Sequence, residues 1–83
     1  MIRVAANGQA EILLNNIPSP NGVALSPDAA FVYVAVTRDN AVWRVPIEAS
    51  GKMGRVSKFI QLSGGSGPDG LAVDQDGNLA ICH

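Results

Sequence analysis

Asn21 and Asp69 are the residues of this chain whose types and positions best suggest chemistry. Each lies between a proline and a glycine, in two similar phrases that are 48 residues apart. An amide oxygen and a carboxylate oxygen are hard donors, of the kind that calcium and magnesium bind in proteins. Asn-Gly and Asp-Gly pairs also form turns, and as turn residues they would only begin two strands. The sequence therefore offers a candidate pair of oxygen donors together with a structural alternative.

The two phrases belong to an internal repeat. Residues 20–28 recur as residues 68–76, with the same proline, glycine, alanine and aspartate at four of the nine positions. A self-match at this period indicates a repeat architecture, in which one small unit buries its apolar surface against copies of itself. The repeat therefore predicts that Asn21 and Asp69 begin equivalent strands of neighbouring units.

Short apolar runs separated by Gly, Asn, Pro and Asp dominate the chain, and no window keeps the spacing of an amphipathic helix. Residues 31–36 are β-branched or aromatic without a polar break, as in a strand that is covered on both faces. Asn7-Gly8 is typical of a two-residue hairpin turn. The pattern predicts an all-β fold with eight short strands, at residues 2–5, 11–14, 23–25, 31–36, 41–47, 56–62, 71–73 and 79–82.

The order of these strands predicts a fragment of a β-propeller. Four consecutive strands between residues 21 and 62 are the content of one blade. The two strands before them resemble its third and fourth strands, because Ile2-Arg3-Val4 is similar to Trp43-Arg44-Val45. The last two strands match its first and second. We therefore predict a single propeller-type β domain over residues 1–83, made of a half blade (1–17), a full blade (18–63) and a half blade (64–83).

Composition and charge argue against several classes of partner. Charged residues make up 16% of the chain, the net charge is −1, and the lysines and arginines are scattered singly. We therefore expect neither nucleic acid nor an anionic membrane as a partner. The N-terminus lacks the regions of a signal peptide and the apolar runs are too short to span a bilayer, so a soluble cytoplasmic protein is expected.

A second group of oxygen donors follows the second repeat. Asp74, Asp76 and Asn78 alternate as they do in a calcium-binding loop. The other ligand positions of such a loop are missing, so the sequence favours a solvated hairpin turn at this point.

Three single residues could also suggest chemistry. His83, the only histidine, aligns with Ala35 in the repeat and is predicted to be a frayed terminal residue. Cys82, the only cysteine, cannot form an intrachain disulfide; it aligns with Val34 and is predicted to be a small buried hydrophobe. Trp43 is predicted to pack inside the blade.

Both repeat phrases, in this order and with a tryptophan strand between them, resemble one known family. It is the senescence-marker-protein, gluconolactonase and luciferin-regenerating family of six-bladed β-propellers. The resemblance covers nearly the whole chain, which amounts to about a third of such a propeller. The matching stretches are residues 20–28, Tyr33-Val34-Ala35, Val42-Trp43-Arg44-Val45, 68–74 and 76–79.

This resemblance implies a metal-dependent lactone hydrolase that acts on a sugar lactone or another small lactone. In the family a divalent metal, usually calcium, lies at the top of the central tunnel and polarises the lactone. By this resemblance Asn21 and Asp69 are the metal ligands, and Asp69 is also the catalytic base. The expected cofactor is a divalent metal, calcium by analogy with the family.

The chain departs from the family pattern at the third metal ligand, a glutamate in an early Glu-Gly-Pro phrase. Neither Glu11 nor Glu48 lies in such a phrase. The substrate-contacting arginine and asparagine of the family also fall in segments that this chain lacks. Two oxygen ligands do not complete a site that needs six to eight. The alternative is therefore a non-catalytic propeller module, either a self-assembling scaffold or an inactive fragment.

Self-association is the expected way to complete the propeller. Eight strands are two blades' worth, so three copies would supply enough strands for a ring of six blades. Each N-terminal half blade would then pair with the C-terminal half blade of a neighbour. We therefore expect a homotrimer, with a dimer as the alternative.

Overall fold

The computed structural model describes residues 1–4, 6–12, 17, 19–48, 50 and 52–83. These residues form β-structure with one short 3-10 helix, η1 (Thr37–Asp39). No helix within them is long and apolar enough to cross a membrane. The strands are β1 (Ile2–Val4), β2 (Ala10–Ile12), β3 (Pro20–Leu25), β4 (Phe31–Val36), β5 (Ala41–Pro46), β6 (Ser57–Gln61), β7 (Leu71–Val73) and β8 (Leu79–Ile81).

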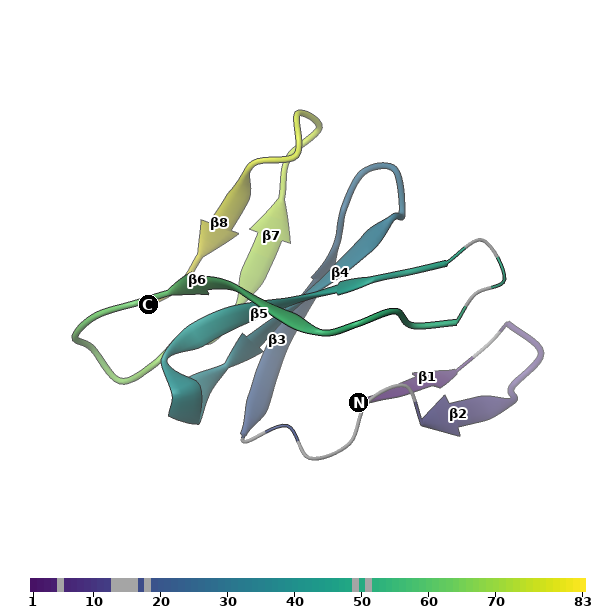
Figure 1. Ribbon diagram of the computed structural model, residues 1–83, viewed down its shortest axis with the longest axis horizontal. Helices are drawn as coiled ribbons and strands as arrows, with labels where there is room; N and C mark the ends of the chain where they lie inside the picture. Colours follow the sequence, from purple (N-terminus) through teal and green to yellow (C-terminus); the bar gives the residue numbers. More distant parts are fainter. Residues whose placement is uncertain (5, 13–16, 18, 49, 51) are drawn as a thin grey trace.

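The strands form three antiparallel sheets (Figure 1). The central sheet has the order β3-β4-β5-β6, and the hairpins β1-β2 and β7-β8 each form a two-stranded sheet. This arrangement confirms the predicted all-β propeller fragment, with a four-stranded unit between two two-stranded units. A hairpin around Asn7-Gly8 is also confirmed, but its last cross-strand pair is Val4 and Ala10, so the connection is longer than the predicted two-residue turn. Residues 5, 13 and 14 of the predicted strands lie outside the described residues, and the division at residues 17 and 63 stays a prediction.

The strand β4 lies at the centre of the fold. Residues 32–36 are at most 8% exposed, because β4 pairs with a strand on each edge and is covered on both faces. Successive residues of a strand face opposite sides of its sheet. One side, here called the valine face, carries Val32, Val34 and Val36, and the other side, the tyrosine face, carries Phe31, Tyr33 and Ala35.

The valine face forms the hydrophobic core. Trp43 is the cross-strand partner of Val34 and packs against this core, which confirms its predicted role. The indole Nε1 of Trp43 also donates a hydrogen bond of 2.8 Å to Asp39. The partly buried side chains that pack on the valine face are Met1, Ile17, Trp43, Ile47 and Met53.

The tyrosine face carries an aromatic cluster. The rings of Tyr33 and Phe59 meet edge to face, with their centroids 5.1 Å apart. The guanidinium of Arg44 lies 4.7 Å from the ring centre of Phe31 and 5.2 Å from that of Phe59, within the range of cation–π attraction. The hairpin β7-β8 lies beside β3 and β4, with β7 against both strands.

The two repeats differ by one residue between their first and second strands. Leu25 pairs with Val32 in the central sheet, whereas Val73, its equivalent 48 residues later, pairs with Leu79. The turn of the second repeat is therefore one residue shorter, so β8 corresponds to β4 with an offset of 47 residues rather than 48.

This shorter turn corrects the prediction for Cys82. With the offset of 47 residues, Cys82 corresponds to Ala35 rather than to Val34. Cys82 is exposed, so the prediction of a buried residue is wrong. It corresponds to a residue of the tyrosine face, and the structure has no further sheet against that face of β7-β8 within the described residues.

His83 makes a side-chain contact with a distant part of the chain. Its Nε2 lies 3.0 Å from the side-chain oxygen of Asn40, and its ring is so close to Gly65 that a Cβ there would meet Nε2 at 2.9 Å. The sequence did not predict this contact, which joins residues 43 positions apart, and the frayed terminal role of the exposed His83 stays a prediction.

Candidate functional site

Asn21 and Asp69 lie at the same end of two neighbouring inner strands. Asn21 is the second residue of β3, and Asp69 comes two residues before β7. β7 packs against β3, so the starts of the two strands are close in space. Both side chains are exposed and therefore accessible to a solvated ion.

A backbone hydrogen bond joins the two positions directly. The amide of Gly22 donates to the carbonyl oxygen of Asp69 over 2.9 Å. A Cβ atom on Gly22 would lie only 2.2 Å from that same oxygen, so this close approach requires a glycine. The structure therefore brings together the two predicted site residues, through the glycine that follows Asn21.

The segment that carries Asp69 is fixed from two other directions. Its own amide donates to the carbonyl oxygen of Cys82 over 2.9 Å. The hydroxyl of Thr37, in η1, donates to the carbonyl oxygen of Pro68 over 2.8 Å, and the amide of Thr37 donates to Ser19 over 3.0 Å. Thr37 thus ties the segment before β3 to the segment before β7.

Thr37 is a positioning residue that the sequence did not single out. Its two partners are 18 residues before it and 31 residues after it, so no local pattern marks it. The only sign of these contacts in the sequence is the glycine at position 67. Gly67 has a φ of +97°, and a Cβ atom there would lie 2.4 Å from the carbonyl oxygen of Thr37.

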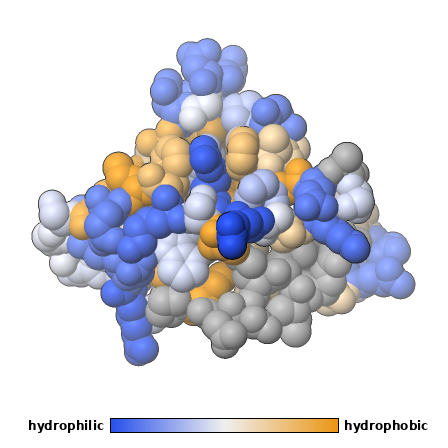
Figure 2. All heavy atoms as spheres, in the orientation of Figure 1, coloured by the Kyte–Doolittle hydropathy of each residue, from blue (hydrophilic) through white to orange (hydrophobic). Residues whose placement is uncertain are grey.

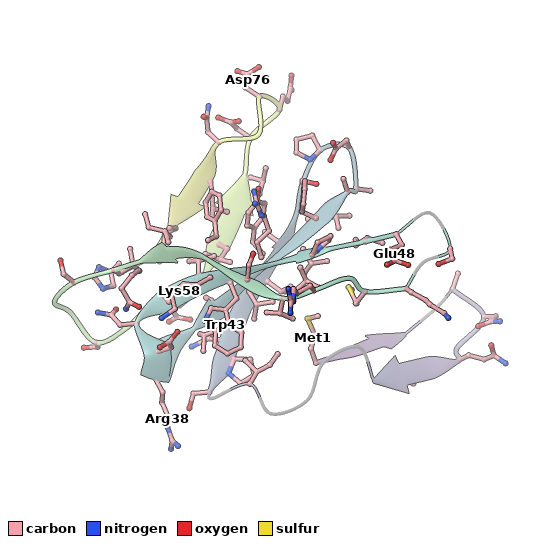
Figure 3. The ribbon with its side chains drawn as sticks, in the orientation of Figure 1. Met1, Arg38, Trp43, Glu48, Lys58 and Asp76 are labelled. Atoms are coloured by element: carbon pink, nitrogen blue, oxygen red, sulfur yellow. The ribbon has the colours of Figure 1, made fainter. Side chains whose placement is uncertain are left out.

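The carboxylate of Asp39, the last residue of η1, already makes contacts within the chain. Asp39 accepts the hydrogen bond from Trp43 and lies 3.1 Å from the Nζ of Lys58. Figure 3 labels these two partners, Trp43 and Lys58. The bond from Trp43, then the bond and charge of Lys58, hold the pKa of Asp39 below its ordinary value. This carboxylate is therefore committed to the fold and is not a free ligand.

The alternating group at residues 74–78 is a hairpin turn, as predicted. The carboxylate of Asp74 accepts the amides of Asp76 and Asn78 over 2.9 and 2.8 Å, and the side-chain amide of Asn78 over 3.0 Å. These bonds, with that of the Asn78 side chain as the largest cause, hold the pKa of Asp74 below its ordinary value of 3.8. Turn formation uses the oxygens that a calcium loop would need.

Replacing Asn78 with alanine should raise the pKa of Asp74 toward 3.8, because the largest stabilising contact of the carboxylate is removed. A lowered pKa stabilises the folded state above pH 3.8, and this stabilisation is lost as pH falls through the folded-state pKa. Carboxyl carbon NMR during an acid titration measures the change. Gln75→Ala, in the same turn, is the control and should leave the Asp74 midpoint in place.

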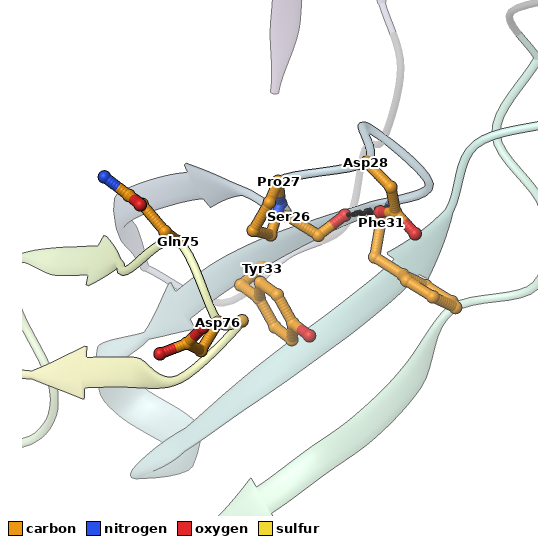
Figure 4. Close-up of a pocket in the computed structure, with 8 residues that line it drawn as sticks. Ser26, Pro27, Asp28, Phe31, Tyr33, Gln75 and Asp76 are labelled. Atoms are coloured by element: carbon orange, nitrogen blue, oxygen red, sulfur yellow. Dashed lines mark hydrogen bonds between the residues drawn. The ribbon is translucent and has the colours of Figure 1, made fainter.

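A pocket in the described part of the chain lies away from this site. It has a volume of about 330 Å³ and lies between the β3-β4 turn and the β7-β8 turn (Figure 4). Ser26 and Asp28 are joined there by a hydrogen bond of 2.7 Å, which confirms Asp28 as a turn residue. The pocket is at the far ends of the strands that begin at Asn21 and Asp69, so it is not the predicted metal site. Its lining residues are Ser26, Pro27, Asp28, Phe31, Tyr33, Gln75, Asp76 and Gly77.

The donor set around Asn21 and Asp69 has the chemistry of a calcium site but is small. Amide and carboxylate oxygens suit calcium, and both residues are accessible. Among the described residues no three His, Cys, Asp or Glu side chains are grouped to hold a metal ion. A calcium ion at this pair would need further oxygen ligands from outside it.

A family model connects this geometry to known proteins. The model described as "SMP-30/Gluconolactonase/LRE-like region" matches residues 1–83. The chain belongs to this family. The resemblance noted from the two repeat phrases is therefore confirmed, and the sheets described above are those of a family of propellers.

Two relatives in the SMP-30/gluconolactonase/LRE-like family carry the names of lactonases. The 6-deoxy-6-sulfogluconolactonase of Pseudomonas putida is 33% identical over 79 residues, which are 93% of this chain and 27% of that protein. Lactonase drp35 of Staphylococcus haemolyticus (strain JCSC1435) is 33% identical over 73 residues, which are 83% of this chain and 22% of that protein. The chain thus spans about a quarter of the length of these relatives.

Proposed function

We propose that this chain contributes to the site of a metal-dependent lactone hydrolase whose substrate is a sugar lactone or another small lactone. Membership of the SMP-30/gluconolactonase/LRE-like family supports this function, as do the lactonase names of the relatives. The observation that carries it is the hydrogen bond from Gly22 to Asp69, because it holds the two oxygen-bearing residues on adjoining backbone segments.

In this proposal Asn21 and Asp69 would hold a calcium ion through their side-chain oxygens, and the ion, when bound, would supply Lewis-acid polarisation of the lactone carbonyl. Asp69 also acts as the general base and takes a proton from that water. The water oxygen bonds to the carbonyl carbon, the ring C–O bond breaks, and the leaving alkoxide takes the proton back from Asp69, so one lactone and one water give one hydroxy acid.

Calcium titration of Asp69→Ala tests the metal assignment. Removal of one charged ligand should lower calcium affinity at least about tenfold, because affinity follows the number of charged ligands in a site. Isothermal titration calorimetry of the wild type and the variant measures this difference.

Asp76→Ala is the matched control for charge, since Asp76 lies at the tip of the β7-β8 turn (Figure 3). It should bind calcium as the wild type does. Equal heats from the wild type and Asp69→Ala, or an equal loss in both variants, would remove the metal assignment.

A non-catalytic module is the second candidate function. The small donor set around Asn21 and Asp69 favours it, because two side-chain ligands do not complete a calcium site. An assay of gluconolactone and aromatic lactone hydrolysis, with calcium and with a chelator, separates the two candidates. Lactone hydrolysis that a chelator abolishes supports the hydrolase, and background rates under both conditions support the module.

A further inference from the structure

The chain contains two Asn-Gly pairs, Asn7-Gly8 and Asn21-Gly22. Asparagine is a thermolabile residue, because the backbone nitrogen of the residue that follows can displace its side-chain amide. A glycine in that position has no Cβ atom to keep the backbone away from the side chain. Both pairs therefore have the local sequence that suits spontaneous deamidation, and the structure decides whether they react equally.

Solvent exposure does not separate the two asparagines. Asn7 and Asn21 are both exposed, so water reaches both side chains. The reaction also needs the glycine nitrogen and the side-chain carbonyl carbon to come close together in the right orientation. The surroundings of Gly8 and Gly22 therefore decide the difference between the two sites.

Gly8 lies in an open turn. It is exposed, has a φ of +89°, and a Cβ atom built on it would meet nothing within 4 Å. Val4 and Ala10 form the last cross-strand pair before this turn in the described part of the hairpin. Figure 2 shows hydrophilic surface at the right edge of the molecule, where Figure 1 places the turn between β1 and β2. The backbone at Asn7 and Gly8 therefore has room to rotate.

The side chain of Asn7 is folded back over the same turn. Its Oδ1 accepts the backbone amide of Gln9 over 3.0 Å. A donor on this oxygen stabilises the negative charge that develops there when a nucleophile attacks the carbonyl carbon. The turn thus gives the glycine nitrogen space and polarises the group that it attacks.

Gly22, in contrast, is held against a second segment. Its nitrogen donates to the carbonyl oxygen of Asp69 over 2.9 Å. A Cβ on Gly22 would lie 3.0 Å from the Cα of Gly70 and 3.1 Å from the nitrogen of Leu71, so backbone atoms are close on that side. The nitrogen of Gly22 can attack Asn21 only after it leaves this hydrogen bond and the two segments separate.

Both sides of this contact are anchored further. Thr37 donates its hydroxyl to Pro68 over 2.8 Å and its amide to Ser19 over 3.0 Å. The amide of Asp69 donates to Cys82 over 2.9 Å. Separation of the two segments therefore disturbs several bonds together, which makes it a local unfolding event.

We propose that Asn7 is a site of spontaneous deamidation and that the contact between Gly22 and Asp69 protects Asn21 from the same reaction. At Asn7 the nitrogen of Gly8 bonds to the side-chain carbonyl carbon, the C–N bond of the carboxamide breaks, and ammonia leaves with the proton of that nitrogen. One water then opens the resulting succinimide ring to aspartate or isoaspartate. One asparagine and one water thus give one acidic residue and one ammonia.

The consequences of the reaction differ between the two sites. At Asn21 it would replace a neutral amide by a carboxylate, and isoaspartate would add a backbone atom directly before the glycine that contacts Asp69. At Asn7 the same change falls in a turn, where such changes are tolerated best. The inference holds whether or not Asn21 binds a metal ion.

Peptide mapping of the full chain after incubation in mildly alkaline buffer measures both sites. Cleavage after Glu11 and Glu48 places Asn7 and Asn21 in different peptides, in which mass spectrometry quantifies asparagine, aspartate and isoaspartate. Asn7 should react at least about tenfold faster than Asn21, because Asn21 reacts only in locally opened molecules.

The same incubation in concentrated urea is the reference. The two rates should there agree within about threefold, because the unfolded chain lacks the contact between Gly22 and Asp69. A ratio of the two rates in buffer that is no larger than the ratio in urea would overturn the proposal.

Thr37→Val tests whether the anchored segment gives the protection. It removes the hydroxyl that binds Pro68 and keeps a similar shape, so Asn21 should react about threefold faster or more, with Asn7 unchanged. Thr37→Ser retains the donor and is the matched control, with wild-type rates at both sites. An unchanged rate at Asn21 in Thr37→Val, or an equal gain in Thr37→Ser, would contradict the protective role of this contact.

Discussion

Replacing Gly22 with alanine should destabilise the fold by about 2–4 kcal/mol, from overpacking and the loss of one hydrogen bond. The added Cβ would lie 2.2 Å from the carbonyl oxygen of Asp69 and 3.0 Å from the Cα of Gly70. Both neighbours are backbone atoms, so relief requires that β3 and the segment before β7 move apart. Urea unfolding followed by the fluorescence of Trp43, the single tryptophan, measures the change.

Gly70→Ala is the matched control, because Gly70 is the repeat equivalent of Gly22. A Cβ on Gly70 would meet only the sulfur of Cys82, at 3.9 Å, which is an ordinary contact. The cost should therefore stay below about 1 kcal/mol. An equal cost for both variants would show that the close approach of the two strands is absent in solution.

Replacing Val34 with alanine should cost about 2–3 kcal/mol, from lost burial and the cavity that remains. Val34 is 2% exposed and lies in the middle of the valine face, opposite Trp43. Its neighbours on this face are backbone-fixed strand residues that cannot collapse fully into the space. Urea unfolding of the purified variant, compared with the wild type, gives the difference in the free energy of unfolding.

Val23→Ala removes the same atoms from the cross-strand partner of Val34 and serves as its control. Val23 is 56% exposed, so the cost should stay below about 1 kcal/mol. A larger cost for Val23→Ala than for Val34→Ala would contradict the assignment of the core.

The strand order could be predicted because the signals that define it are local. Asn7-Gly8 fixes a hairpin turn, and the run from Phe31 to Val36 has no polar residue that could face water. The repeat of residues 20–28 then assigns the last two strands to the same positions in a unit as β3 and β4. The sheets of two, four and two strands agree with these signals.

The register of the last hairpin could not be predicted with the same accuracy. The repeat match ends at Asp76, and one residue is missing from the turn that follows, so Cys82 and His83 each move by one position. In a strand, a shift of one residue exchanges the two faces. Cys82 therefore lies on the opposite face of the hairpin from the predicted one, and it is exposed there. Only the pairing of β7 with β8 shows this.

The sequence alone determined the class of the fold, the family resemblance and the two candidate ligands, because turn residues, β-branched runs and a repeated phrase act over a few neighbouring positions. Only the tertiary structure decided that the amide of Gly22 binds the carbonyl of Asp69 and that Thr37 holds Pro68. These contacts join residues 47 and 31 positions apart, and backbone groups carry no sequence signal of their partners. The geometry of the candidate site is therefore a property of how the sheets pack.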